Sequence, residues 1–304
     1  MRMTGKLQGA NPLWMRLRTP AKVSLSLQVL GKRKDGYHDV RLVLVPVSLY
    51  DTVCFQGTPG VSLALAVDSV EDLGPIEENL IWRAAQRFEQ AARVALQARI
   101  RLVKHIPSGA GLGGGSGNAA GTLVALNALH GGPLSGEALL AEAAALGSDV
   151  PFFIAPHPAL CEGRGDRLTP LAGLPRLILL VVKPSIAMET ARAYRMLEAA
   201  REASAPPVPA PLPPLTTVDA VVAALHNDFE PVLFARHAEL AEARARLLAE
   251  GALGAVLTGT GSAVFGVFRD QSARDRAAVR LGRVGRWTVL PCESLGGHSY
   301  DFES

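Results

Sequence analysis

Residues 107–117 read Pro-Ser-Gly-Ala-Gly-Leu-Gly-Gly-Gly-Ser-Gly, and the interpretation of the whole chain starts from this glycine loop. Six of its eleven residues are glycine, so ordering the loop costs much backbone entropy. Residues 99–106 before it have the β-branched content and rough alternation of a strand, and residues 118–129 after it form an apolar run typical of a helix. A strand, a glycine loop and a helix in this order direct backbone N–H groups and a helix N-terminus toward an anion. The stretch therefore predicts a phosphate-binding loop.

Two better-known glycine motifs compete with this interpretation. A nucleotide-binding P-loop ends in Gly-Lys followed by Ser or Thr, but Ser116 is followed by Gly-Asn here. The pattern G-x-G-x-x-G does occur between Gly109 and Gly114, yet a dinucleotide site also needs an acidic residue about 20 positions later, at the end of the next strand. The acidic residues at that distance lie in a predicted helix over 136–146. An NAD-binding oxidoreductase stays open on the glycine pattern alone.

The composition favours a globular protein that binds a small anion. The chain has 304 residues, 48% of them hydrophobic and 19% charged, which is enough for two domains with a sizeable core. A net charge of +3 suits an anionic small molecule. Nucleic acid is a poor match, because the arginines are scattered and aromatic residues make up only 5% of the chain.

The three cysteines, Cys54, Cys161 and Cys292, are far apart and have no CxxC motif or His cluster beside them. Neither a disulfide framework nor a zinc site is predicted, and a reducing cytoplasm is the expected compartment. No apolar run has the length of a membrane span, so no membrane association is expected. Residues 1–19 lack the continuous apolar core of a signal peptide and are interpreted as an N-terminal extension.

Strands and helices alternate in both halves of the chain, which predicts an α+β fold of two lobes. Further strands are predicted over 22–29, 40–50, 63–67, 177–182 and 287–290. Further helices are predicted over 79–98, 188–203 and 276–281, with three short ones between 215 and 250. The proline-rich stretch 205–214 is predicted to be an extended loop, and 257–265 a second glycine turn followed by a strand. We assign 20–172 to a first domain and 173–304 to a second, with the site expected in the cleft between them.

Two charged residues stand out beside predicted elements. Residues 22–29 alternate, so Lys22 and Ser24 are expected on one face of their strand and four apolar residues, from Val23 to Val29, on the other. Asp149 is a lone carboxylate between the end of a helix and an apolar segment that is expected to be a strand. From the residues alone, a solvated surface lysine and a helix-capping aspartate are equally good interpretations.

Four separated blocks together resemble the GHMP kinase superfamily. They are Pro-Ala-Lys at 20–22, Asp-Gly-Tyr-His at 35–38, the glycine loop with the asparagine after it, and Leu-Gly-Ser-Asp-Val-Pro-Phe at 146–152. The segments 227–230 and 258–263 are also similar to motifs of that superfamily. The order and spacing of the blocks, from about residue 20 to residue 268, make the set specific. The resemblance implies a two-lobed α+β GHMP kinase fold, with an ATP-binding lobe and a substrate-binding lobe around a central cleft.

The resemblance implies transfer of a phosphoryl group from ATP to an alcohol, with Mg²⁺ present. The Asp-Gly-Tyr-His block and the Asn-Ala ending of the glycine loop are most similar to members that phosphorylate a cytidine-diphosphate-linked methylerythritol to its 2-phosphate, on the non-mevalonate route to isoprenoids. A small-molecule substrate, no nucleic acid, no membrane, and a monomer or weak homodimer are expected. A homoserine or mevalonate kinase of the same superfamily and a non-enzymatic RNA-binding module of related fold remain alternatives.

The resemblance also implies a role for each matching residue. Asp149 matches the aspartate that takes the proton of the substrate hydroxyl, and Lys22 matches its lysine partner. The residues expected to contact ATP are Asn79, Pro107, Ser108, Gly109, Ala110, Gly111, Leu112, Gly113, Gly114, Gly115, Ser116 and Gly117. Those expected to contact the substrate are Ser24, Tyr37, His38, Thr190 and Tyr194, of which Tyr37, His38 and Tyr194 hold the cytosine. No side-chain ligand for a metal ion is expected.

The sequence departs from the usual pattern of the superfamily branch at three positions. Ser24 stands where asparagine is usual, Gly117 where a second serine is usual, and Gly121 where threonine is usual. We expect the shorter Ser24 hydroxyl to act through a water molecule, because it shares the Lys22 face of the strand. Gly117 is expected still to offer its N–H group to a phosphate.

Overall fold

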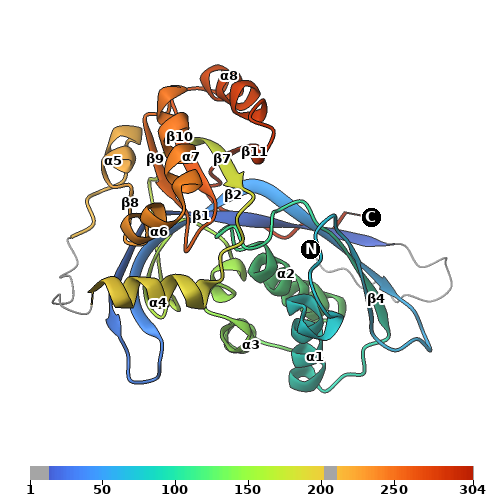
Figure 1. Cartoon of the computed structure of the whole chain (residues 1–304). Helices are drawn as coiled ribbons and strands as arrows, with labels where there is room; N and C mark the ends of the chain where they lie inside the picture. Colours follow the sequence, from blue (N-terminus) through green and yellow to red (C-terminus); the bar gives the residue numbers. More distant parts are fainter. Residues whose placement is uncertain (1–13, 202–210, 304) are drawn as a thin grey trace.

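The computed structural model describes residues 14–201 and 211–303, in which two sheets stand at the centre of the molecule (Figure 1). The first sheet has the order β3-β4-β2-β1-β8, with β5 joined to β2 and β6 to β5; the second has the order β11-β7-β10-β9. The first sheet consists of β1 (Met15–Lys32), β2 (His38–Gly57), β3 (Ala64–Asp68), β4 (Ala98–Val103), β5 (Ala159–Gly163), β6 (Arg167–Pro170) and β8 (His226–Asn227). The second consists of β7 (Ile178–Pro184), β9 (Gly254–Leu257), β10 (Val264–Phe268) and β11 (Trp287–Glu293).

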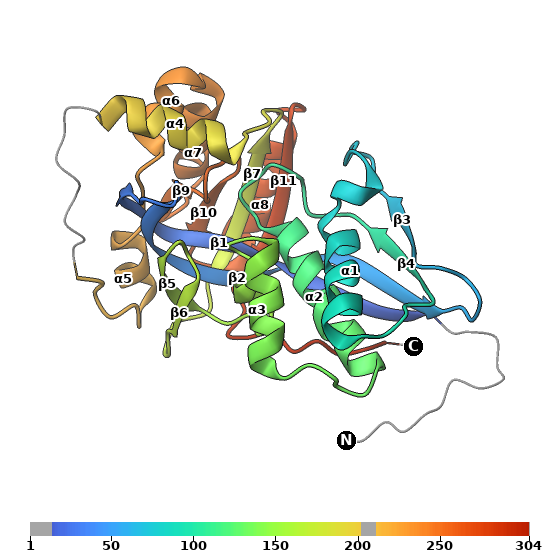
Figure 2. The same cartoon turned by 90° about the horizontal axis from the view of Figure 1, so that it is seen from below.

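Helices cover the outer face of each sheet, as Figures 1 and 2 show. On the first sheet they are α1 (Leu80–Ala92), α2 (Gly114–Leu129) and α3 (Gly136–Leu146), and on the second α7 (Ala238–Ala249) and α8 (Gln271–Gly282). The remaining helices are α4 (Thr190–Arg201), α5 (Val218–Ala223), α6 (Glu230–Arg236) and the short 3₁₀ helices η1 (Ile76–Glu78) and η2 (Pro151–Phe153). None of the helices in the described ranges is long and apolar enough to cross a membrane. The predicted α+β fold is confirmed.

The long β1–β2 hairpin lies between two hydrophobic cores. Val23 and Leu25 pack with β7 and β10 of the second sheet, whereas Leu27 and Val29 pack in the core beneath the helices. The register of β1 on β2 shifts between Ser24 and Ser26, and an extra residue in one strand reverses the faces beyond it. The expectation that all four apolar residues share one face is therefore wrong.

Among the predicted elements whose bounds or type differ in the structure, three have a clear local cause. The helix predicted over 79–98 ends at Ala92, because Arg93 adopts a left-handed conformation with φ 55°. The helix after the glycine loop begins at Gly114, four residues earlier than predicted, because Gly113 supplies the left-handed residue before it. The apolar segment after Asp149 is η2, since Pro151 at its first position fixes a helical φ. The extended loop predicted over 205–214 falls largely outside the described residues.

Two segments from the second half of the chain return to the first sheet. β8 pairs with β1, and the C-terminal segment forms bridges from Ser294 to Val47 and from Glu303 to Arg16. Along the chain, the first strand of the second sheet, β7, follows β6 of the first sheet, so the change of sheet lies near the domain division proposed at residue 172. Because of the returning segments, that division into two domains stays a prediction.

Candidate active site

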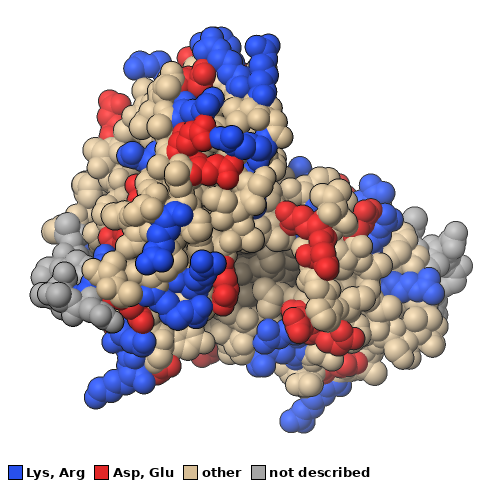
Figure 3. Space-filling model, viewed as in Figure 1, with Lys and Arg blue, Asp and Glu red and all other residues tan. Residues whose placement is uncertain are grey.

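A cleft of about 930 Å³ opens where the glycine loop, the β1–β2 hairpin and α4 meet. Figure 3 shows the molecule hollowed at its centre, with Lys and Arg side chains gathered on the side of the hollow where α4 lies. The site residues expected from the sequence that line this cleft are Lys22, Tyr37, His38, Asn79, the loop residues 107–116, Asp149, Thr190 and Tyr194. Ser24 and Gly117 do not line it.

The glycine loop owes its path to three left-handed residues. Gly109, Gly111 and Gly113 have φ values of 60°, 73° and 69°, which residues with a side chain rarely adopt. A Cβ atom at Gly111 would lie 2.1 Å from the carbonyl oxygen of Thr258. Glycine at this position therefore allows the loop to touch the second glycine turn, residues 258–261.

The carbonyl groups of residues 109–112 in the loop accept hydrogen bonds from residues 258–263 and from Lys22. Those of Gly109 and Ala110 accept from the N–H groups of Ser262 and Ala263, each at 3.1 Å. The next two carbonyls accept from the Thr258 hydroxyl at 3.2 Å and the Lys22 N–H at 2.9 Å. The first N–H groups of α2, at residues 114–116, have no acceptor within the helix. With its carbonyls turned away, the loop can present these N–H groups to an anion in the cleft.

Lys22 and Asp149 form an ion pair beside the loop. Their Nζ and Oδ2 atoms are 3.7 Å apart, and the Lys22 side chain is 4% exposed whereas that of Asp149 is 38% exposed. A Cβ atom at Gly113 would lie 3.1 Å from Cγ of Lys22, which places the lysine against the loop. Within the described residues, no side chain caps η2 through a hydrogen bond, so the interpretation of Asp149 as a helix cap is not supported. The structure brings together the two residues that the sequence suggested as a pair.

Three aromatic rings, those of Tyr37, His38 and Tyr194, also line the cleft. The rings of His38 and Tyr194 stack with centroids 4.5 Å apart, and the guanidinium of Arg164 lies 4.8 Å from the centre of the half-exposed Tyr37 ring. Glu198 Oε1 lies 2.9 Å from Lys32 Nζ and 2.8 Å from His38 Nε2. The hydrogen bond from Lys32, and then that from His38, holds the pKa of Glu198 below its usual value.

Two other titratable groups near Asp149 stay protonated at neutral pH. Burial, with a smaller contribution from the negative charge of Asp149, raises the pKa of Cys161 to about 12. The same two causes, in the same order, raise the pKa of Tyr194. Neither group is thus available as a base.

Several expected site residues also form hydrogen bonds within the protein. Oδ1 of Asn79 accepts from the N–H of Ile81 at 3.0 Å and caps α1, while Asn79 also lines the cleft. The Thr190 hydroxyl lies 3.2 Å from that of Thr260 in the second glycine turn. Ser24 is fully buried, and its Oγ accepts from Lys22 Nζ at 3.4 Å.

The expectation that Gly117 offers its N–H group to a phosphate is wrong. That group donates to the carbonyl of Gly113 at 2.9 Å, in the first turn of α2. A Cβ atom at Gly117 would lie 2.8 Å from the carbonyl oxygen of Pro20, and one at Gly121 would lie 2.6 Å from Cγ2 of Thr19. Glycine at both departures from the family pattern therefore allows α2 to approach β1 closely.

Sequence reasoning missed several charged residues that line the cleft, namely Glu78, Lys104, Arg164, Arg195 and Glu198. Arg164 lies in the polar turn between β5 and β6, far along the chain from the hairpin that it touches. One signal was available for Glu198. It follows Tyr194 by four residues in α4, and residues at that spacing share one face of a helix.

Comparison with known proteins agrees with this fold. The family model of the GHMP kinases N terminal domain matches residues 79–156, and that of the GHMP kinases C terminal domain matches residues 216–286. The fold is accordingly that of the GHMP kinases. A homoserine kinase structure from Cytophaga hutchinsonii, with a TM-score of 0.71 over 97% of this chain and 99% of its own, is only 16% identical and shows the fold alone.

Relatives with higher identity define the family within that class. A 4-diphosphocytidyl-2-C-methyl-D-erythritol kinase of Geobacter sp. (strain M21) is 40% identical over 92% of this chain and 99% of its own length. The one of Pelotomaculum thermopropionicum is 42% identical over 86% of this chain and 92% of its own. A crystal structure of 4-(cytidine 5'-diphospho)-2C-methyl-D-erythritol kinase has a TM-score of 0.77 and 35% identity, and covers 92% of this chain and all of its own. The chain belongs to the 4-diphosphocytidyl-2-C-methyl-D-erythritol kinase family.

Proposed function

We propose that the protein transfers the γ-phosphoryl group of ATP to a hydroxyl of 4-diphosphocytidyl-2-C-methyl-D-erythritol, giving the 2-phosphate of that alcohol. The observation that carries this proposal is the Lys22–Asp149 ion pair against the glycine loop, in a cleft that aromatic rings also line. Phosphoryl transfer needs alignment and charge neutralisation more than covalent help from the protein. A cleft that joins an anion-binding loop, a base and a ring-binding pocket meets those needs.

Asp149 is the proposed general base. Its partly exposed carboxylate faces the cleft, where it would take the proton of the substrate hydroxyl as the oxygen attacks phosphorus. The ammonium of Lys22 would stabilise the negative charge that forms on that oxygen. Because Lys22 is almost fully buried and also donates to Ser24, its position does not depend on bound substrate.

ATP is the proposed phosphoryl donor, with its phosphates at the N–H groups of residues 114–116 and its base toward Asn79. Mg²⁺ keeps most of its water and binds phosphate oxygens with one or two protein oxygens, so Ser116, an oxygen-bearing side chain of the loop that lines the cleft, fits as the residue that would hold it through its water. When bound, the ion would neutralise charge on the phosphates. In the described part of the chain, no group of three or more His, Cys, Asp or Glu side chains could hold a metal ion.

The substrate end is proposed to bind cytidine. The Tyr37 ring and the stacked pair of His38 and Tyr194 line the cleft as ring surfaces for the cytosine, and base stacking on an aromatic side chain is worth about 1–3 kcal/mol. A homoserine or mevalonate kinase would have no use for such rings, since its substrate carries no base. We also propose that the enzyme acts in the cytoplasm, as a monomer or weak homodimer; its three free, buried cysteines suit a reducing compartment.

The test is an ATP-consumption assay with three alcohols, the cytidyl substrate, homoserine and mevalonate, repeated with Asp149→Asn. We expect turnover with the cytidyl substrate and its loss in the variant. Turnover with only homoserine or mevalonate would overturn the proposed substrate, whereas the proposed kinase activity would stand. RNA binding with steep salt dependence and no ATP turnover, or NADH binding in a fluorescence titration, would overturn the proposal.

A further inference from the structure

A fully buried carboxylate lies under the base of the glycine loop and has no place in the mechanism above. Asp51, in β2, is 0% exposed. Its Oδ1 accepts from the N–H groups of His105 and Ile106, each at 2.7 Å. These two residues lead into the glycine loop.

The other oxygen of the same carboxylate contacts the helix that follows the loop. Oδ2 of Asp51 accepts from Nδ2 of Asn118, in the second turn of α2, at 2.9 Å. It also lies 2.9 Å from Nζ of Lys104, whose side chain is 6% exposed and which donates to the carbonyl of Ile106. Thr19 Oγ1 donates to Oδ1 of Asn118 at 2.5 Å, which fixes the orientation of that amide. One side chain thus joins the segment that enters the loop to the helix that leaves it.

The number of donors explains why this residue is a carboxylate. The two oxygens of a carboxylate provide about four acceptor sites. The four donors named above use them, two on each oxygen. Burying a carboxylate is costly, and an apolar residue of similar size would be cheaper if only packing were needed. The cost is offset where several donors on two segments must be held at one spacing.

We propose that Asp51 is a positioning residue of the phosphate-binding loop. Residues 258–263 hold the carbonyls of residues 109–111, and Asp51 sets the distance between the segment that enters the loop and the helix that follows it. Together they keep the N–H groups at the start of α2 directed into the cleft. The inference rests on the proposed function only in taking ATP as the anion that binds there.

Asp51→Asn is the main test, because it keeps the shape of the side chain but removes the charge and turns one acceptor into a donor. We expect the Kd for ATP, measured by calorimetric titration, and the KM for ATP each to rise by about 10- to 100-fold, as loss of hydrogen bonds to a charged group predicts. The KM for the cytidyl alcohol should change little. Thr19→Val, an isosteric change that frees the Asn118 amide, should raise the Kd for ATP by about 2- to 10-fold and covers the case in which Asp51→Asn does not fold.

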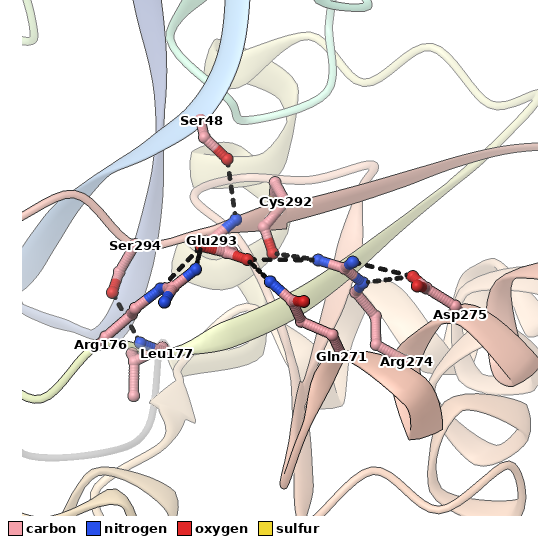
Figure 4. A network of polar contacts seen from close by, with 9 residues as sticks. All are labelled: Ser48, Arg176, Leu177, Gln271, Arg274, Asp275, Cys292, Glu293 and Ser294. Carbon is pink, nitrogen blue, oxygen red and sulfur yellow. Dashed lines mark hydrogen bonds and ion pairs between the residues drawn. The ribbon is translucent and has the colours of Figure 1, made fainter.

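Glu293→Gln is the matched control. Figure 4 shows its carboxylate in another network of several donors, where it accepts from Arg176 at 2.7 Å and from Gln271 at 2.6 Å. None of these three residues lines the cleft. This variant should lower the melting temperature and leave the Kd for ATP unchanged. If Asp51→Asn and Thr19→Val also lose only thermal stability, Asp51 is structural and the inference is overturned. If the wild-type protein itself binds no ATP in the titration, it is the proposed function that fails, whichever alcohol is offered.

Discussion

Lys22 and Asp149 differ sharply in exposure although their charged groups are 3.7 Å apart. The lysine is enclosed by the glycine loop and Ser24, so it is held in place, while the aspartate keeps one side open to the cleft. A base must reach the hydroxyl that it deprotonates, whereas a charge that stabilises the forming oxyanion works best when fixed in advance. The asymmetry of the pair suits this division of roles.

Asp149→Asn and Lys22→Ala should each lower kcat by about 10²- to 10⁴-fold, the usual contribution of a general base or of a fixed charge at the reacting oxygen. ATP affinity should change little, because the N–H groups of the loop remain in place. Steady-state kinetics with ATP as the varied substrate measure both quantities. Glu250→Gln, which breaks a surface ion pair with Arg280, is the control. Near-normal turnover by either site variant would remove the role assigned to that residue.

Tyr37→Ala and Tyr194→Ala should act on the other substrate. Each should raise the KM for the cytidyl alcohol by about 10- to 100-fold, since a stacked base is worth about 1–3 kcal/mol. The KM for ATP should stay the same, and Tyr37→Phe, which keeps the ring, should behave as wild type. Initial-rate measurements at saturating ATP decide the matter. A rise in both KM values, or in neither, would contradict a cytidine pocket at these rings.

The contact between the glycine loop and the second glycine turn leaves no room for a side chain at Gly111. Gly111→Ala places a Cβ atom 2.1 Å from the Thr258 carbonyl oxygen and forces alanine into a left-handed conformation. We expect a lower melting temperature and weaker ATP binding, by scanning calorimetry and titration. Gly136→Ala, in the first turn of α3 with open space around it, is the control and should be neutral or stabilising. Unchanged ATP binding by Gly111→Ala would show that the two turns need not touch.

Asp228 joins three elements and makes their association dependent on pH. Oδ2 accepts from the Val29 N–H of β1 at 2.7 Å and pairs with Arg201 of α4 at 2.8 Å, while Oδ1 lies 2.7 Å from His226 of β8. Burial acts to raise the pKa of Asp228, but hydrogen bonds from His226 and Arg201 outweigh it, so the pKa is lowered. The stabilisation is therefore complete above the unfolded-state pKa of about 3.9 and is lost as the pH falls through the folded-state value.

Asp228→Asn should accordingly reduce the free energy of unfolding at pH 6 and flatten its decline below about pH 4. Urea unfolding at a series of pH values measures this. Asp166→Asn, at an exposed turn, is the control, and its free energy of unfolding should vary with pH as in the wild type. An unchanged slope for Asp228→Asn would contradict the role given to this carboxylate.

The C-terminal segment joins the second half of the chain to the first. Glu303 bridges to Arg16, and Oη of Tyr300 donates to the carbonyl of Phe153 at 2.6 Å. Burial raises the pKa of the Tyr300 phenol, as expected of a hydroxyl enclosed beside η2 and α2. The two halves are thus expected to unfold together, and changes in this segment should affect stability without reaching the cleft.

Tyr300→Phe should lower the free energy of unfolding by about 1 kcal/mol, because it removes one buried hydrogen bond and nothing else. Denaturant unfolding followed by fluorescence and by circular dichroism should give coincident single transitions for variant and wild type. Tyr50→Phe is the control, since the Tyr50 hydroxyl has no hydrogen-bond partner within residues 14–201 and 211–303. Separate transitions for the two probes would show that the halves unfold independently.

Local patterns carried much of the prediction from sequence. Ser135 caps α3, which runs over 136–146 as predicted, and the glycine loop does stand between a strand and a helix. The bulge near Leu25 could not be predicted, because strand register depends on the partner strand. Asp51 was missed for a similar reason, since its donors lie 54 and 67 residues away. The roles of the site residues remain predictions, although the structure gathers most of them at one cleft.

The bonds from residues 258–263 to the glycine loop also bear on how the protein is made. A ribosome releases the loop long before it has synthesised Thr258, so the nascent N-terminal half lacks the donors that hold the loop carbonyls. We therefore expect the loop to reach its final path only after translation has passed this distant turn, so that the site is completed late in synthesis.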